Sequence, residues 1–114
     1  MTFDVEAFLP SSVADALTDR RINDPDAPRR AARARRRRAV LAPDGRLNIL
    51  AADHPARRVT DVQDDPLRMA DRRDYLARVL RVLLSDAVDG IMATMDLLDD
   101  LLIVHELLDQ AGGP

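Results

Sequence analysis

Two short apolar runs alternate with polar, helix-forming stretches in the second half of the sequence. The first, residues 47–52, follows the turn sequence Ala42-Pro43-Asp44-Gly45 and leads into Asp53-His54-Pro55. The second, residues 91–95, follows Asp89-Gly90. Short apolar runs bounded by turn residues are typical of buried parallel strands. We therefore predict two parallel strands joined by a right-handed crossover.

Apolar residues at helical spacing predict a long helix after each run. The first helix begins at Pro66, ends near Ser85 and buries a stripe made of Leu76, Val79, Leu80 and Leu83. The second begins at Asp96 and carries a wide apolar face that includes Leu97, Leu101, Val104 and Leu108. Residues 111–114, Ala-Gly-Gly-Pro, predict the end of that helix. So wide a face needs more partner surface than one helix and two strands provide.

The first forty residues predict two further helices. Ser11 or Ser12 caps a short helix that runs to about Arg20. Residues 29–38 are all Arg or Ala, both good helix formers. This arginine run is either a solvated helix that pairs with the abundant Asp residues or a surface that binds phosphate groups. It lacks the interleaved aromatic residues of a single-strand nucleic-acid binder, so we expect the solvated helix.

The predicted order is helix, helix, strand, helix, strand, helix. Two parallel strands do not make a stable buried sheet, and a closed (β/α)8 barrel needs about 250 residues. We therefore predict an α/β fold: the N-terminal portion of a TIM (β/α)8 barrel. Residues 1–40 would form an N-terminal helical segment with the arginine-rich helix, and residues 41–114 the first two β-α units of an incomplete barrel. The alternative is a free-standing small α/β domain that covers its strands by self-association.

Composition narrows the classes of function. The 114 residues carry a net charge of −3, too small to attract nucleic acid or acidic lipid to the molecule as a whole. Cysteine is absent, and no apolar run is long enough to span a bilayer, so we expect a soluble, cytoplasmic protein without membrane partners. All 17 basic residues are arginine. A guanidinium cannot replace the lysine amine of a Schiff-base mechanism.

Residues 48–57, together with Val88-Asp89-Gly90-Ile91-Met92-Ala93-Thr94 and the leucine-rich helix after them, carry a resemblance to a known family. They resemble the start of a (β/α)8 family of class I aldolase-like proteins, found in actinobacteria and often associated with inositol-catabolism genes. These are related to bacterial and archaeal class I fructose-bisphosphate aldolases, whose first strand ends in Asp-His. The resemblance covers about residues 28–114. One departure is Pro55, where a glycine is expected, and which should place His54 in an extended backbone.

The resemblance implies a function and a partial site. Asp53 matches an acidic residue that helps proton transfer beside the Schiff-base carbon, whereas the lysine lies on a later strand and is absent here. It implies an aldolase-like, Schiff-base lyase of carbohydrate catabolism acting on a phosphorylated sugar without a cofactor. This chain would then be an N-terminal fragment, inactive alone and dependent on missing barrel segments or on a homo-oligomer.

Each candidate residue also has a structural interpretation. Asp53 is either the catalytic acid or base or a residue that caps a turn. His54 either orients Asp53 or substrate or serves only in the turn. Arg57, with its neighbour Arg58, either binds an anionic substrate or is solvated. Thr94 faces either the open end of the predicted barrel, at the carboxyl ends of the strands, which we favour, or the core. We predict no metal site, because the other histidine, His105, falls on the surface of the distant second helix.

A non-enzymatic function is the alternative. A small arginine-rich module could bind nucleic acid or a protein partner through residues 29–38. Binding that collapses with salt and is lost when those arginines are replaced would favour this module.

Overall fold

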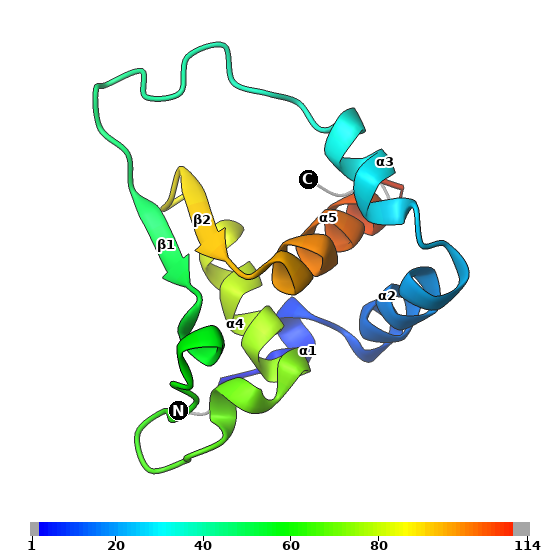
Figure 1. Cartoon of the computed structure of the whole chain (residues 1–114), viewed down its shortest axis with the longest axis vertical. Helices are drawn as coiled ribbons and strands as arrows, with labels where there is room; N and C mark the ends of the chain where they lie inside the picture. The colour runs from blue at the N-terminus through cyan, green and yellow to red at the C-terminus, as the bar shows by residue number, and fades with distance from the viewer. Residues whose placement is uncertain (1–2, 111–114) are drawn as a thin grey trace.

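The chain folds into five α-helices, two short strands and two 3-10 turns within the described residues, 3–110, of a computed structural model (Figure 1). The predicted helix end at residues 111–114 lies outside the described residues. In chain order the elements are α1 (Val5–Phe8), α2 (Ser11–Asn23), α3 (Ala27–Ala34), β1 (Ile49–Ala52), η1 (His54–Arg57), η2 (Arg68–Ala70), α4 (Arg72–Leu83), β2 (Gly90–Ala93) and α5 (Met95–Gln110). None of the described helices is long and apolar enough to cross a membrane.

The two predicted strands form and pair in parallel, which confirms that part of the prediction. Ile49 pairs with Gly90 and Ala52 with Ala93, and α4 lies between the strands in the sequence. Because side chains alternate along a strand, Leu50 and Ala52 point toward the helices while Ile49 points away.

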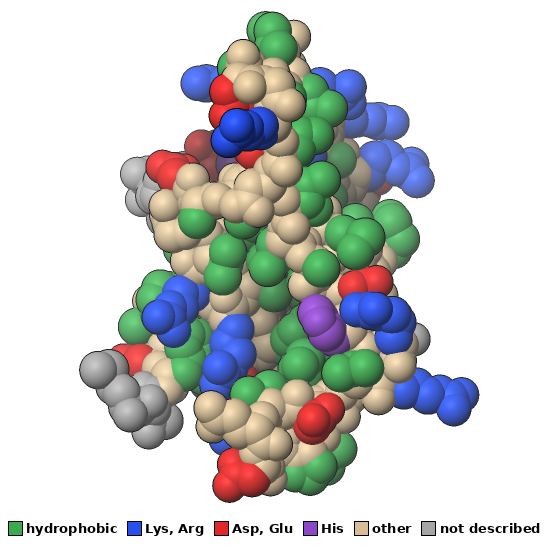
Figure 2. Space-filling view, turned by 90° about the vertical axis from the view of Figure 1, so that its left-hand side faces the viewer, with side chains coloured by type: hydrophobic (Ala, Val, Ile, Leu, Met, Phe, Trp, Pro, Cys, Tyr) green, Lys and Arg blue, Asp and Glu red, His purple; other side chains and the backbone are tan. Residues whose placement is uncertain are grey.

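No element of the described part of the chain covers the outward face of this sheet. Ile49 is 54% exposed and Met92 is 52% exposed, although both belong to apolar strand sequences. Figure 2 looks onto the side of the molecule where β1 lies and shows hydrophobic side chains reaching the surface there. The sheet therefore has one buried face and one solvent-exposed face.

Helix α4 begins later than predicted. Pro66 lies in a turn, the 3-10 turn η2 follows, and the α-helix begins at Arg72. Asp71 is the N-cap, because its carboxylate accepts a hydrogen bond from the backbone N–H of Asp74 at 3.1 Å. The predicted stripe is largely correct: Leu76, Val79 and Leu80 are buried, and Leu83 is half-buried against the core.

The core forms where α2 and α3 pack on α5, and α1 packs on α4 (Figure 1). Ile103 and Val104 of α5 are 0% and 2% exposed, and Leu9, between α1 and α2, is 1% exposed. Helix α3 contributes Ala27 and Ala31, whose small side chains allow close approach to α5. The N-terminal helices thus cover the wide apolar face of α5.

This packing overturns the prediction of a TIM-barrel portion. The structure is a small compact domain, 55% helical, with only two short parallel strands among the described residues. The barrel prediction rested on the wide apolar face of α5 and on its need for more partner surface. That face is instead covered from within the chain by α2 and α3, because residues 11–34 fold back onto it.

Ion pairs reinforce the contact of α5 with the rest of the chain. The Asp100 carboxylate, whose side chain is 1% exposed, accepts hydrogen bonds from Arg21 Nη1 at 3.0 Å and from Arg72 Nε at 2.7 Å. Six residues later on α5, Glu106 pairs with Arg20 at 2.6 Å and with Arg30 at 2.7 Å. Helices α2, α3 and α4 are therefore each tied to α5 by charge as well as by apolar contact.

A long connector, residues 35–48, joins α3 to β1 and arcs away from the other elements (Figure 1). Its return to the sheet is anchored at Asp89, whose carboxylate accepts hydrogen bonds from the Asn48 backbone N–H and from Arg38, both at 2.9 Å. The Asn48 N–H first, and the Arg38 guanidinium second, hold the pKa of Asp89 below its ordinary value. These bonds fix the entry to β1.

Candidate functional site

The strand register brings two of the predicted site residues together. Ala52 of β1 pairs with Ala93 of β2, so the next residues, Asp53 and Thr94, follow side by side at the carboxyl edge of the sheet. Side chains at the carboxyl ends of parallel strands commonly form binding and catalytic sites in α/β proteins. We call Asp53, His54, Arg57 and Thr94, together with Tyr75 described below, the strand-end cluster.

Asp53 does not cap the turn that follows it. It precedes the 3-10 turn η1 and forms no side-chain cap hydrogen bond. Its carboxylate, 27% exposed, instead lies 3.4 Å from Arg57 Nη2 at the other end of that turn. This bond is long and the Arg57 side chain is 60% exposed. An exposed pair of this kind contributes only about 0–1 kcal/mol, so Arg57 is free to exchange the carboxylate for an anionic ligand.

His54 begins η1 and does not have the extended backbone expected from Pro55. Pro55 is the second residue of the 3-10 turn, where its missing N–H costs no hydrogen bond. The backbone carbonyl of His54 accepts a hydrogen bond from the N–H of Val59 at 3.0 Å, which closes the loop. Arg58 adopts the left-handed conformation, with φ of 62°, where the turn ends. The backbone of His54 thus has a structural role in the turn, and its side chain is half-buried.

Tyr75 joins the strand-end cluster although no motif in the sequence places it there. Its hydroxyl donates a hydrogen bond to the backbone carbonyl of Ala52 at 2.5 Å, directly before Asp53. Burial first, and the negative charge of Asp53 second, raise the pKa of Tyr75 above its ordinary value. The tyrosine therefore stays protonated near neutral pH. The one sequence signal is that Tyr75, the chain's only tyrosine, precedes Leu76 of the predicted stripe.

Thr94 lies in a second polar group at the same edge. Arg72 first, and the Thr94 hydroxyl second, form hydrogen bonds that lower the pKa of Asp96 to about 2. The bond from Arg72 Nη1 to Asp96 Oδ2 is 2.7 Å long. Burial lowers the pKa of Arg72, but its hydrogen bonds with Asp96 and Asp100 outweigh burial and raise it overall. Thr94 thus hydrogen bonds to Asp96, and the half-buried threonine remains at the edge.

The strand-end cluster provides the components of acid–base chemistry. It holds a partly exposed carboxylate, a protonated phenol and an exposed guanidinium around the end of β1. A carboxylate can accept or return a proton, while a guanidinium binds phosphate or carboxylate groups. Within residues 3–110, no group of three or more His, Cys, Asp or Glu side chains is arranged to hold a metal ion. His105 lies exposed on α5.

In the arginine run, residues 29–38, some arginines form ion pairs (the paired part) and others form none within the described residues (the free part). Helix α3 ends at Ala34, so the predicted helix to Arg38 is too long. Arg30 pairs with Asp24 and Glu106, and these hydrogen bonds, that with Glu106 first, raise the pKa of Arg30. By contrast, four exposed arginines form no ion pair within the described part of the chain: Arg33, Arg35, Arg36 and Arg37.

Comparison with known proteins identifies a family for the second half of the structure. No curated protein matches the chain, and no solved structure does. A family model described as Cgl0159-like matches residues 45–111, which include both strands, α4 and α5. The match covers more than half of the sequence and contains the whole strand-end cluster. The chain therefore belongs to the Cgl0159-like family.

Proposed function

We propose that this chain supplies the acid–base part of a cytoplasmic, class I aldolase-like lyase of carbohydrate metabolism. The observation that carries the proposal is the position of Asp53, beside Arg57 and within electrostatic reach of Tyr75 at the carboxyl end of β1. The resemblance of residues 48–57 to aldolase-like proteins supports the same reaction class. A phosphorylated sugar is the substrate we expect.

The residues have distinct roles in this proposal. Asp53 transfers the proton during carbon–carbon bond cleavage, because it is the partly buried carboxylate of the cluster. Arg57 leaves Asp53 to bind the substrate phosphate, and the side chains of His54 and Thr94 position the sugar hydroxyl groups. Tyr75 holds the end of β1 in place through its bond to Ala52.

The Schiff-base step requires an amine from another polypeptide segment. The sequence contains 17 basic residues, all of them arginine. A second copy of this chain would bring no lysine either. The proposal therefore includes a lysine-bearing partner, or a further segment of a longer protein, that faces the carboxyl edge of the sheet.

The first experiment measures substrate binding without requiring turnover. We would titrate ¹⁵N-labelled protein with dihydroxyacetone phosphate and expect saturable NMR shifts at Asp53, His54 and Thr94. Arg57→Gln should weaken binding about tenfold, since it removes one charge-assisted contact. Arg33→Gln removes an exposed arginine elsewhere and is the matched control. Shifts that are absent, or that both variants weaken equally, would contradict the binding role.

The second experiment tests the lysine-bearing partner. Protein purified from the source cells would be treated with the same triose phosphate and borohydride, which reduces a Schiff base to a stable amine. Mass spectrometry should then find the adduct on a lysine of a co-purifying segment. A preparation that binds the triose phosphate but yields no adduct would rule out the Schiff-base route.

A second candidate function is suggested by the free part of the arginine run. We propose, as the alternative, that Arg33, Arg35, Arg36 and Arg37 bind a nucleic-acid backbone. Their exposure and lack of ion pairs within residues 3–110 favour it. If all four contact phosphates, replacing them with Gln should reduce the salt slope of duplex DNA binding by about 3.6. An unchanged slope would exclude this alternative.

A further inference from the structure

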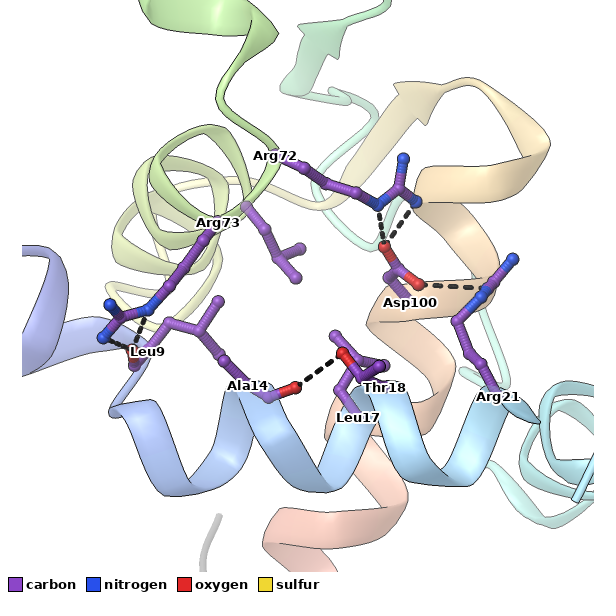
Figure 3. Close-up of a pocket in the computed structure, with 9 residues that line it drawn as sticks. Leu9, Ala14, Leu17, Thr18, Arg21, Arg72, Arg73 and Asp100 are labelled. Carbon is purple, nitrogen blue, oxygen red and sulfur yellow. Dashed lines mark hydrogen bonds and ion pairs between the residues drawn. The ribbon is translucent and has the colours of Figure 1, made fainter. Parts of the chain in front are cut away.

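The cavity between the helices and the edge of the sheet differ in how their polar groups are satisfied. In the cavity, of about 190 Å³ between α2, α4 and α5, the Asp100 carboxylate binds both Arg21 and Arg72 (Figure 3). Within residues 3–110, no buried side-chain nitrogen or oxygen lacks a hydrogen-bond partner. The backbone of β1, by contrast, has polar groups that bind no other described residue.

Alternate residues of β1 direct their backbone N–H and C=O groups away from β2. The carbonyl of Asn48 accepts a hydrogen bond from the N–H of Asp89 at 2.7 Å, so every second residue counted from Asn48 faces β2. Ile49 and Ala51 therefore face the other edge, where neither forms a backbone hydrogen bond with a described residue. Figure 1 shows β1 on the outer side of β2, at the edge of the molecule.

This edge of β1 lacks the usual protection against pairing. Natural proteins protect edge strands with charged side chains, proline or a bulge. The strand reads Ile-Leu-Ala-Ala and contains no charged residue and no proline. The side chains of Ile49 and Ala51 are also exposed. An edge of this kind is a template for pairing with another strand.

The charges that flank β1 favour a second copy of this chain in the antiparallel orientation. Arg46 precedes β1 and Asp53 follows it. Arg46 is exposed and forms no ion pair within residues 3–110. An antiparallel arrangement places the start of one β1 against the end of the other, so arginine meets aspartate at both ends. Self-pairing of β2, which lies between Asp89 and Asp96, would instead place carboxylates against carboxylates.

We propose that two copies of this chain pair through the free edges of their β1 strands, related by a two-fold axis. Ile49 of each copy lies opposite Ala51 of the other, and these residues exchange backbone hydrogen bonds. The result is a continuous sheet in the order β2-β1-β1-β2. Leu47 of each copy then lies opposite Asp53 of the other, so the neighbouring Arg46 pairs with that carboxylate.

This pairing is independent of the proposed function, although it brings an arginine of the second copy to the strand-end cluster. The dimer should be weak, because its contact consists of one four-residue strand and the residues beside it. Interfaces below about 1,200 Å² are typical of transient complexes. We therefore expect a dissociation constant on the order of 100 µM.

The first measurement uses the unaltered protein. In sedimentation equilibrium between about 10 µM and 1 mM, the mass should rise from 12.7 kDa toward twice that value. Over the same range, amide hydrogen exchange should slow at Ile49 and Ala51 but not at Met92, on the opposite edge of the sheet. A mass that stays at 12.7 kDa, species larger than a dimer, or slowing at Met92 in place of Ile49 and Ala51 would overturn the proposal.

The second measurement exchanges the flanking charges. Arg46→Asp and Asp53→Arg each put like charges together at both ends of the interface, so each variant alone should dimerise at least about tenfold more weakly. An equimolar mixture of the two variants should form a heterodimer about as tight as the unaltered dimer, because every pair across the interface is again of opposite sign. Arg33→Asp makes the same charge change on α3 and should leave dimerisation unchanged.

A mixture that dimerises no better than either variant alone would contradict the antiparallel arrangement. The mass and hydrogen-exchange measurements need no substitution, so they decide the proposal even if Asp53→Arg does not fold.

Discussion

The helical side and the sheet side of this molecule are stabilised to different degrees. On the helical side, Ile103 is fully buried and Asp100 and Glu106 each bind two arginines. On the sheet side, the two strands, each of four residues, pair with no other strand in residues 3–110, and Ile49 is about half exposed. Regions with few buried contacts open at lower free-energy cost. The strand-end cluster therefore lies on the less stable side, where ligand-induced movement is easiest.

The largest expected effect comes from removing the central charge of the helical side. Asp100→Ala leaves Arg21 and Arg72 without their shared partner, and breaking a buried pair costs about 3–5 kcal/mol. We expect the low end, about 3 kcal/mol, because both arginines can reach water. Urea unfolding followed by circular dichroism would measure it. Asp99→Ala is the control, since Asp99 forms no ion pair among the described residues. Equal losses in the two variants would mean that the ion pairs of Asp100 add no stability beyond that of a carboxylate without an ion pair.

A smaller loss of stability is expected when the same substitution, Ile to Val, is made once on each side. Ile103→Val and Ile49→Val each remove one methylene group, the first from a side chain that is 0% exposed and the second from one that is 54% exposed. We expect a loss of about 1 kcal/mol at Ile103 and under about 0.3 kcal/mol at Ile49. The same unfolding assay measures both. A similar loss at both positions would mean that the outer sheet face is covered in solution.

The smallest expected effect concerns the ion pair between the first turns of α4 and α5, Arg72 with Asp96. Because the folded-state pKa of Asp96, about 2, lies below its ordinary value of 3.8, the folded protein binds the proton less readily than the unfolded chain. The stabilisation is thus present above about pH 4 and disappears as pH falls through 2. The stability gap between wild type and Asp96→Asn should narrow over that range in urea titrations at about pH 5, 3 and 2. A gap that stays constant would mean that Asp96 contributes no charge-dependent stability.

Local patterns predicted both strands and four of the five α-helices of the described residues, but neither α1 nor how the elements pack. The strands and the stripe of α4 follow from the hydrophobic pattern, and the parallel pairing follows from the long helix between the strands; both are read from residues near one another in the sequence. The cover that α2 and α3 give to α5 depends on contacts between residues far apart in sequence, such as Arg20 with Glu106, which no local pattern encodes. The barrel prediction failed for that reason.

The candidate site was likewise predictable only where it depends on local sequence patterns. Asp53 and Thr94 follow from the two strand ends, whereas Tyr75 reaches the cluster only through the docking of α4 on β1. The sequence does contain a signal for the buried Asp100. It follows Leu97 by three residues and precedes Val104 by four, so a charge interrupts the apolar stripe of α5 and marks a buried ion pair.

Proteolysis in the connector between α3 and β1 would divide the chain into two pieces. Trypsin cutting after the exposed Arg35, Arg36 or Arg37 would yield one piece with α1–α3 and another with both strands, α4 and α5. The bonds from Arg20 and Arg30 to Glu106, and from Arg73 to the carbonyl of Leu9, all cross that cut. The two pieces would therefore remain associated after cleavage, which suits the protein to reconstitution from separately expressed halves.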